Sequence, residues 1–357
     1  MRLFIVAGDP SGDLHAGKLA EKIKQLNPGI EIFSAGGREL AKTTQQVIDL
    51  ESLAVTGLFE VLTYLGKIIK AFNFLLKKIE RLNPQAVILV DFPDFNLRLA
   101  KKLKLKNYKI FYYISPQVWA WRKKRINLIR EFVDKLLVIF PFEEEFYKRE
   151  GIKVVYTGHP LTERIPPGLT EKKEKIIALF PGSRKKEVKR HLPAFIETKK
   201  IIGEKFQFIL IKHPKLPSQI FTQALGEGIT LVERDNLETI AKSYLALASS
   251  GTATLELALL KIPTVVIYKM NFLSWLVLKT MVKTDFASIV NILAKEEVFP
   301  EFLQNKANSE NLAKALKRFI EDRNFYLQTQ NKLERIRKLL GDRPSSLTAA
   351  EEILKEL

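Results

Sequence analysis

The segment Ile176–Arg184, with the sequence IIALFPGSR, decides the fold expected for this chain. Five apolar residues form a buried-strand pattern, a proline–glycine turn follows, and a helical pattern begins after the arginine. Such a junction leaves backbone N–H groups exposed at the positive end of a helix, which favours a bound phosphate. The arginine adds a charged donor for the same ligand. We therefore predict a diphosphate contact at Gly182, Ser183 and Arg184.

A second junction of the same kind lies further along the chain. The apolar run Tyr244–Ala248 leads into the sequence SSGTAT, and a helical pattern follows. Ser250, Gly251 and Thr252 are the expected phosphate contacts here. Glu256, one helical turn later, is placed to accept two ribose hydroxyl groups, the alternative being a charge on a helix surface. Two such turns in one half of the chain predict a nucleotide-diphosphate pocket.

Two other residues in this half bear on the predicted nucleotide site. Arg184 has a simpler alternative role, a surface ion pair with Glu187, and such pairs contribute little stability. Asn291 ends the apolar run 288–291 and is a candidate for contact with phosphate or sugar. Both stay in the predicted site as candidates.

The composition limits the classes of protein to which the chain can belong. Its 357 residues are enough for two domains. The absence of cysteine excludes thiolate chemistry, disulfides and cysteine metal sites. The four histidines lack the close spacing of a zinc site and no D-x-D motif is present, so we expect neither a metal nor a cofactor. A formal net charge of +18 indicates an anionic partner: nucleic acid, a phosphorylated metabolite or an acidic membrane.

Short β-rich runs alternate with helical patterns along most of the chain, which predicts parallel sheets with helices on both faces. The alternation pauses at Thr162–Lys173, a charged stretch containing Pro-Pro-Gly, which we interpret as a linker. We therefore expect an α/β protein of two Rossmann-like domains facing across a cleft. Their predicted ranges are 1–165 and 166–335, and 336–357 is a C-terminal helix that could return to the first domain.

The expected elements follow from the same pattern. The predicted strands are residues 3–7, 30–34, 86–91, 109–114, 136–140 and 154–157, then 176–180, 207–211, 229–232, 244–248 and 264–268. The predicted helices of the first half include 14–26, 67–82 and 96–104.

Asp91 directly follows the apolar run 86–90. An aspartate just past a buried strand lies at the edge of a crevice, where partial desolvation raises its pKa toward that of a useful general base. We therefore predict Asp91 as a catalytic residue. Asp94 is favoured as a cap for a helix that opens at Asn96, and capping is also the simpler alternative for Asp91.

The first strand is followed by GDPSGD, residues 8–13. The spacing is not that of the dinucleotide fingerprint, and the ending of a Walker loop is missing, so a nicotinamide site and a P-loop are rejected. A glycine-rich turn at a strand end can still let an acceptor approach the backbone at Gly8, Ser11 and Gly12. The alternative is an ordinary turn with Asp13 at the start of a helix.

Residues 115–125 place Trp119 and Trp121 before four basic residues. Three interpretations stay open: stacking on nucleic-acid bases, an apolar wall for a phosphorylated lipid, and core packing. For the tryptophans alone, core packing is favoured.

Two further segments combine apolar and basic residues. The helical pattern 67–82 has an apolar face that includes Phe72 and Leu76; a core face is the commoner explanation, and an interfacial membrane helix is the alternative. The run 272–278 is apolar on nearly all sides but too short to span a bilayer, so it could enter a membrane interface or bury against a partner. Its candidate contacts are Phe272, Trp275 and Leu276.

Taken in order, these motifs resemble those of the lipid-A-disaccharide synthase family, inverting lipid glycosyltransferases with the GT-B fold. The matching stretches are AGxxSGD (7–13), DxPDFN (91–96), YxSPxVWAW (113–121), GH (158–159), PGSRxxEV (181–188), SGTAxLE (250–256) and VKTDF (282–286). The chain departs from the family at Asp9-Pro10, where Glu-Ala is usual. It also departs at 35–39, a loose second glycine turn, and at Val290, where proline is usual.

The resemblance implies metal-independent transfer of 2,3-diacylglucosamine from UDP to the 6-hydroxyl of 2,3-diacylglucosamine 1-phosphate. The products would be a β-1,6-linked disaccharide 1-phosphate and UDP. The N-terminal domain would bind the acceptor, with Asp91 as base, and the C-terminal domain would bind the UDP-sugar, with Arg184 at the diphosphate and Glu256 at the ribose. The implied acceptor-side residues are Gly8, Ser11, Gly12, Asp13, Asp94 and Trp119.

The resemblance also implies a cytoplasmic enzyme, peripheral on the anionic inner face of the inner membrane of a Gram-negative-type bacterium. It implies no nucleic-acid partner, and it leaves monomer and swapped dimer open. Two other functions fit parts of the pattern. A sugar-nucleotide epimerase or soluble glycosyltransferase would keep the fold, although the basic amphipathic stretches argue against it. A nucleic-acid-binding protein would explain the charge and the basic segment at 122–125, but no recognisable DNA or RNA module is present.

Overall fold

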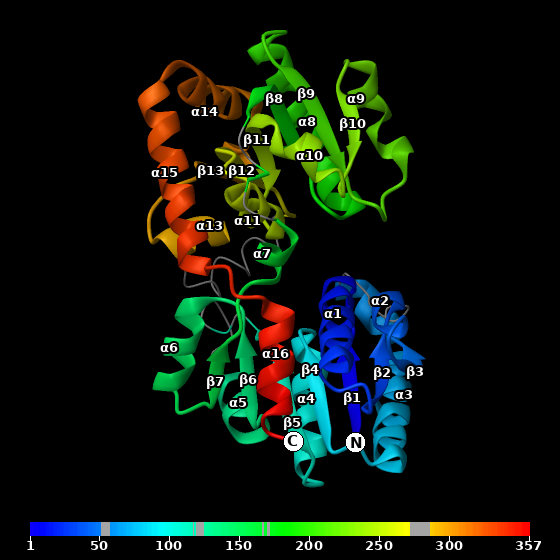
Figure 1. Cartoon of the computed structure of the whole chain (residues 1–357). Coiled ribbons are helices and arrows are strands. Elements are labelled where there is room, and N and C mark those ends of the chain that lie inside the picture. The colour runs from blue at the N-terminus through cyan, green and yellow to red at the C-terminus, as the bar shows by residue number, and fades with distance from the viewer. Residues whose placement is uncertain (51–57, 117, 119–124, 166–167, 170–171, 272–285) are drawn as a thin grey trace. The chain divides into compact units, whose positions relative to one another are not determined.

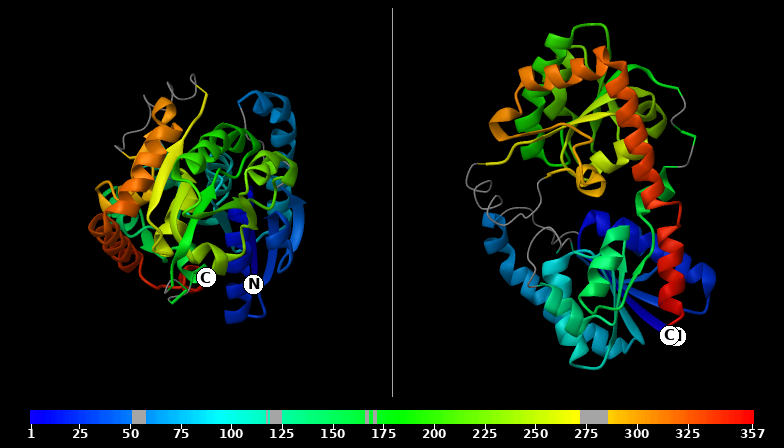
Figure 2. Two further views of the ribbon diagram at one scale, coloured as in Figure 1. Left: turned by 90° about the horizontal axis from the view of Figure 1, so that it is seen from above. Right: turned by 90° about the vertical axis from the view of Figure 1, so that its left-hand side faces the viewer.

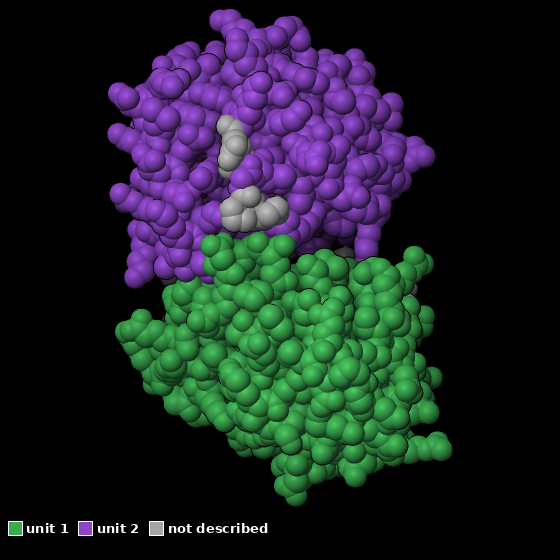
Figure 3. Space-filling view, in the orientation of Figure 1, with its two compact units in different colours: residues 1–163, 342–357 green, residues 164–341 purple. Residues whose placement is uncertain are grey.

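The computed structural model describes residues 1–357 apart from 51–57, 117, 119–124, 166–167, 170–171 and 272–285. The chain divides into two compact units (Figure 3). Unit 1 comprises Met1–Glu163 and Asp342–Leu357, and unit 2 comprises Arg164–Gly341. Each unit is built on one parallel sheet with helices packed against it (Figures 1 and 2).

The sheet of unit 1 has seven strands in the order β3-β2-β1-β4-β5-β6-β7. Their bounds are β1 Arg2–Ala7, β2 Glu31–Gly36, β3 Gln45–Asp49, β4 Ala86–Val90, β5 Lys109–Tyr113, β6 Lys135–Val138 and β7 Val154–Tyr156. The helices in the first segment of the unit are α1 Pro10–Leu26, α2 Arg38–Ala41, α3 Leu58–Leu82, α4 Pro93–Lys104, α5 Arg125–Phe132 and α6 Pro141–Arg149, and α7 Pro160–Arg164 contains the unit boundary.

Alternate residues of the central strands face opposite sides of this sheet, as the pleat requires. In β1, Phe4 and Val6 pack with apolar residues of α3 to α6. Leu3 and Ile5 pack with α1, α2 and the C-terminal helix α16, Ser345–Leu354. Because both faces are covered, the strands read as continuous apolar runs.

Helix α16 returns to unit 1 and packs beside α1 (Figure 1). Lys135, whose side chain is 9% exposed, pairs with Glu352 at 2.7 Å and Glu356 at 3.0 Å. The hydroxyl groups of Tyr113 and Ser345 lie 2.8 Å apart. These buried contacts, together with apolar packing, hold the C-terminus on the sheet that the N-terminus begins.

The sheet of unit 2 has six strands in the order β10-β9-β8-β11-β12-β13. Their bounds are β8 Glu174–Phe180, β9 Gln207–Lys212, β10 Thr230–Glu233, β11 Ser243–Ser249, β12 Thr264–Tyr268 and β13 Glu301–Leu303. Its helices are α8 Lys185–Ile202, η2 Ser218–Phe221, α9 Thr222–Gly226, α10 Leu237–Ala241, α11 Thr252–Leu259, α13 Ile289–Ala294, η3 Gln304–Lys306, α14 Ser309–Glu321 and α15 Arg323–Leu340. Helices α8 and α14 bury one apolar face of the sheet, and α11 packs against β11, β12, α13 and α15.

The parallel α/β architecture predicted from the sequence is confirmed, and every predicted strand is present. The pattern missed β3 and β13, which are edge strands: β3 is mostly polar and β13 has three residues. All three helices predicted for the first half begin earlier than expected: α3 begins at Leu58, α1 at Pro10 and α4 at Pro93. For α1 and α4 the reason is that proline is well suited to the first turn of a helix.

Candidate active site

The predicted loops lie at the points where each strand order reverses. In unit 1 the reversal is between β1 and β4, and Ala7 pairs with Val90, so the turns that begin at Gly8 and Asp91 leave the sheet side by side. In unit 2 it is between β8 and β11, where Phe180 pairs with Ala248. Ligands of such sheets bind beyond the carboxyl ends of the strands at these points. Each unit therefore brings together two loops that the sequence singled out.

Asp91 is held in an uncommon backbone conformation. Asp91 and Phe92 have φ values of 47° and 49°, in the left-handed region that non-glycine residues rarely adopt. The surrounding sheet fixes this turn, because the Asp91 N–H donates to the carbonyl of Tyr113 at 3.1 Å. The Asp91 carbonyl accepts from the Tyr112 hydroxyl at 2.6 Å and from Asn96 Nδ2 at 2.8 Å. Strained backbone of this kind concentrates at functional sites.

The pKa of the Asp91 carboxyl group is raised toward neutral pH. Burial, together with the negative charge of Asp9, raises its pKa from 3.8 to about 7, although the N–H of Phe92 donates to Oδ1 at 2.9 Å and acts in the opposite direction. Asp9 is in turn the N-cap of α1, where its Oδ1 accepts from the Gly12 N–H at 2.7 Å. A carboxylate whose pKa lies near the working pH can accept a proton from an attacking hydroxyl.

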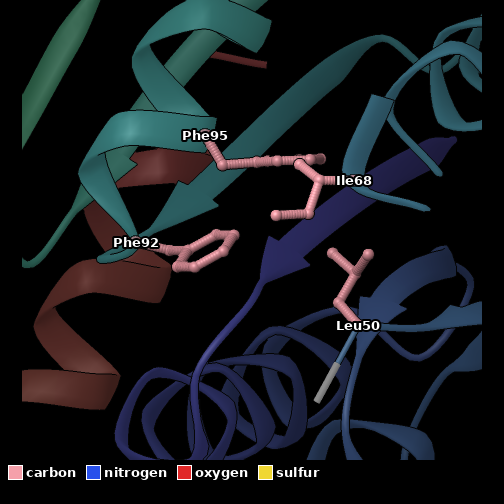
Figure 4. Close-up of a pocket in the computed structure, with 4 residues that line it drawn as sticks. All are labelled: Leu50, Ile68, Phe92 and Phe95. Carbon is pink, nitrogen blue, oxygen red and sulfur yellow. The ribbon is translucent and has the colours of Figure 1, made fainter. Parts of the chain in front are cut away.

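A small apolar pocket lies next to Asp91. Leu50, Ile68, Phe92 and Phe95 line it, and their side chains point toward a common space (Figure 4). The ring of Phe92 also packs over Gly8, where any Cβ atom would lie 2.2 Å from the ring. A larger residue at this position would force the Phe92 ring to move, and this aromatic side chain comes directly after the candidate base.

The other predicted residues of unit 1 have mostly structural partners. Asp13 lies in the first turn of α1, as predicted, and its buried carboxylate accepts from the backbone N–H groups of Gly37, Glu39 and Leu40 at the start of α2. Asp94 lies within the first turn of α4 and binds a guanidinium nitrogen of Arg125 at 2.5 Å, so it is not the cap of a helix at Asn96. Ser11 is exposed in the first turn of α1. Trp119 lies outside the described residues.

In unit 2, a side chain occupies the turn predicted to bind a diphosphate. Gly182 has φ 122°, and the Glu187 carboxylate lies over it, with Oε2 accepting from the N–H groups of Ser183 at 3.1 Å and Arg184 at 3.3 Å. Glu187 Oε1 accepts from the Arg184 guanidinium at 3.2 Å. The anion-binding character of the turn is thus visible, with an internal carboxylate as the anion. The Arg184 side chain remains 60% exposed.

The second turn forms the start of α11. Gly251 is the N-cap, and Thr252 is the first helical residue, so the first N–H groups of the helix lack intrahelical partners by geometry. The Ser250 hydroxyl donates to the carbonyl of Ala287 at 2.8 Å. The N-terminus of α11 therefore supplies anion-binding amides at the carboxyl edge of the sheet.

Glu256 is 1% exposed and paired with two arginines that sequence reasoning missed. Its Oε2 lies 2.8 Å from Arg234 and 3.6 Å from Arg164. Arg234 directly follows β10, and this position just past a predicted strand is the signal that could have identified it. Glu256 is therefore a buried acceptor within an ion-pair cluster, not a charge on a helix surface.

Asn291 is buried and its side chain is used within the fold. Its Nδ2 donates to the Phe299 carbonyl at 2.8 Å and to Glu301 at 2.7 Å, and its Oδ1 accepts from the N–H groups of Val298 and Phe299. These bonds join α13 to the segment before β13. The structure thus places Asn291 as a brace of this segment.

Of the residues predicted to contact a membrane, Phe72 and Leu76 are half-buried against the core of unit 1, and Phe72 packs edge-to-face on Phe95 with ring centroids 5.3 Å apart. Among the side chains of α3 that the structure describes, those from Gly66 on, the large apolar ones that are exposed are Ile69 and Phe74, at 51% and 42%. The other three candidates, in the run 272–278, lie outside the described residues. Among the helices of the described part, none is long and apolar enough to cross a membrane.

Solved structures resemble the whole chain. A UDP-GlcNAc 2-epimerase from Neisseria meningitidis bound to UDP-GlcNAc has a TM-score of 0.61 at 14% identity and covers 99% of this chain and 100% of that one. The glycotransferase of kitacinnamycin has a TM-score of 0.65 at 12% identity, over 100% and 99% of the two chains. At such identities the likeness shows the fold alone. The two parallel-sheet units are those of the GT-B class, which contains nucleotide-sugar glycosyltransferases and epimerases.

The sequence comparison is more specific. A family model described as lipid-A-disaccharide synthetase matches residues 3–356. A lipid-A-disaccharide synthase of Geobacter metallireducens is 37% identical over 373 residues, which cover 100% of this chain and 97% of the relative. The chain therefore belongs to the lipid-A-disaccharide synthase family and is a glycosyltransferase of lipid A biosynthesis, with a UDP-sugar donor and a lipid acceptor. The predicted family, fold and activity are confirmed, and the epimerase and nucleic-acid-binding alternatives are not favoured.

Proposed function

We propose that the chain transfers 2,3-diacylglucosamine from UDP to the 6-hydroxyl of 2,3-diacylglucosamine 1-phosphate, with Asp91 as the general base. The observation that carries this proposal is the Asp91 carboxyl group, whose pKa is raised to about 7 at the strand-order reversal of unit 1. The adjacent pocket lined by Leu50, Ile68, Phe92 and Phe95 is apolar but has a volume of only about 10 Å³, so these side chains must move apart before an acyl chain of the acceptor can contact them. Unit 1 is accordingly the acceptor-binding domain.

Unit 2 is the donor-binding domain in this proposal. The N–H groups of Ser183 and Arg184, the Arg184 guanidinium and the N-terminus of α11 can together stabilise a diphosphate. In the structure the N–H groups of Ser183 and Arg184 donate to the Glu187 carboxylate. Glu187 therefore has to release these two N–H groups when the donor binds. Glu256 accepts the ribose hydroxyl groups of the UDP moiety.

The proposed reaction is a single displacement at the anomeric carbon. The acceptor O6 attacks C1 of the donor sugar as its proton passes to the Asp91 carboxylate, and the bond between C1 and the diphosphate oxygen breaks. The electron pair of that bond stays on UDP, whose developing charge Arg184 and the backbone amides stabilise. Attack opposite the leaving group inverts C1, which turns an α-linked donor into a β-1,6-linked product.

We also propose that the enzyme works as a peripheral protein on the anionic inner face of the inner membrane of a Gram-negative-type bacterium. Helix α3 exposes Ile69 and Phe74 among the exposed lysines Lys70 and Lys77. Apolar side chains beside basic charge suit an acidic lipid surface, because each contributes to binding independently. Flotation with vesicles containing anionic lipid should weaken several-fold in Ile69→Glu, Phe74→Glu relative to the wild type. Equal flotation of the two proteins would refute this contact.

Incubation with UDP-2,3-diacylglucosamine and 2,3-diacylglucosamine 1-phosphate tests the reaction, with products identified by mass spectrometry. The expected products are the disaccharide 1-phosphate and UDP. Arg184→Ala should raise the Kd for UDP about tenfold, the value of a charge-assisted hydrogen bond. Absence of disaccharide would overturn the proposed substrates, and an unchanged Kd in Arg184→Ala would remove Arg184 from the diphosphate site.

A further inference from the structure

The carboxylate of Glu256 is held through only one of its two oxygens. Oε2 lies 2.8 Å from Arg234 and 3.6 Å from Arg164. Oε1 is buried and has no hydrogen-bond partner within the part of the chain that the structure describes. Leaving a buried charged acceptor unsatisfied is costly, so the asymmetry indicates an acceptor kept for something other than the fold.

Arg234 is itself fixed by its surroundings. Its guanidinium lies over the ring of Phe180 at 4.9 Å, at the end of β8, and its side chain is 19% exposed. Arg164 donates to the Arg234 carbonyl at 3.3 Å, which ties the two arginines together. A guanidinium held over a ring and tied to a second arginine has little freedom, so it can hold the carboxylate in one orientation.

We propose that Arg234 is a positioning residue for the ribose of the nucleotide, because it holds Glu256 by Oε2 and leaves Oε1, which is buried without the nucleotide, to accept a ribose hydroxyl once binding opens access to it. This inference rests on the proposed ribose-binding role of Glu256. The two arginines also balance the charge of Glu256, which would otherwise repel a diphosphate bound at the neighbouring turns. The cluster thereby selects a ribonucleotide over its 2′-deoxy counterpart.

The test is the ratio of Kd values for UDP and 2′-deoxyuridine diphosphate, measured by titration calorimetry. A hydrogen bond to an ionised carboxylate predicts that the wild type binds UDP about 10-fold or more tightly than the deoxy ligand. In Arg234→Met the ratio should fall to less than about threefold, mainly through weaker UDP binding. Arg335→Met, an exposed arginine on α15, is the matched control and should leave both Kd values unchanged.

The outcomes separate the inference from the proposal on which it rests. A wild-type ratio near one would refute the ribose role of Glu256 and the inference with it. A large wild-type ratio that Arg234→Met preserves would overturn the role of Arg234 alone, even if both ligands bind more weakly. If Arg234→Met fails to fold, the same two Kd values are measured in Arg234→Gln, which keeps a hydrogen-bond donor and much of the side-chain volume. A Kd ratio at least threefold below that of the wild type supports the inference, and an unchanged ratio overturns it.

Discussion

Replacing Asp91 by asparagine should change activity and stability in opposite directions. A positioned general base contributes about 10²–10⁴-fold to a rate, so kcat/KM should fall by that factor in Asp91→Asn. In the wild type, kcat/KM should rise with pH and level off above a midpoint near 7, because the base must be ionised and burial together with Asp9 raises the pKa of Asp91 to about 7. The variant should lose this pH dependence.

The effect on stability follows from the same pKa. Asp91 has its ordinary pKa of 3.8 in the unfolded chain and about 7 when folded, and each pH unit corresponds to about 1.4 kcal/mol, so its ionised form destabilises the fold by at most about 4 kcal/mol. The folded state binds more protons between these two pKa values, so stability declines as pH rises from about 4 to 7. Asparagine carries no charge, so the variant should be more stable than the wild type above pH 7.

Product formation measured from pH 5.5 to 8.5, together with urea unfolding at pH 5 and pH 8, checks both effects. Asp342→Asn removes an exposed carboxylate from the same unit and should change neither. Wild-type activity independent of pH from 6 to 8, or an Asp91→Asn variant with full turnover, would refute the reasoning. A variant less stable than the wild type at pH 8 would show that the carboxylate is not desolvated as inferred.

Three further predictions concern single side chains. Asp13→Ala leaves three backbone N–H groups at the start of α2 without an acceptor. The free energy of unfolding, measured by urea titration, should therefore fall by about 2–4 kcal/mol. A loss below about 0.5 kcal/mol would contradict the capping role. Glu187→Gln weakens the internal anion on the Ser183 and Arg184 amides, so UDP should bind about threefold more tightly by calorimetry, and weaker binding would instead make Glu187 part of the site. Lys135→Met leaves Glu352 and Glu356 without their most buried partner, so protease should remove α16 severalfold faster than from the wild type. In the control Lys355→Met, where the lysine is exposed, the rate of cleavage should stay that of the wild type.

Much of the fold was predictable because the chain is locally consistent. Apolar runs such as 86–90 and 176–180 are long enough and buried enough to be recognised as central parallel strands. Strands β3 and β13 were not recognised, because β3 is mostly polar and β13 has only three residues, so neither contains a continuous apolar run of strand length. The starts of α1 and α4 were misplaced for another reason, since a proline at the first turn is compatible with a helix as well as with the loop before it.

The sequence by itself determined the two sheets, the family and the loops that carry the candidate chemistry, because these depend on residue order and on local backbone preference. Only the tertiary structure decided which atoms meet. It placed Asp9 near enough to raise the pKa of Asp91, set the Glu187 carboxylate on the PGSR turn, and paired Glu256 with Arg234 across 22 positions of the chain. The strength of an interaction between charges depends on the distance between them and on how deeply they are buried. Neither the distance nor the burial can be read from spacing along a chain.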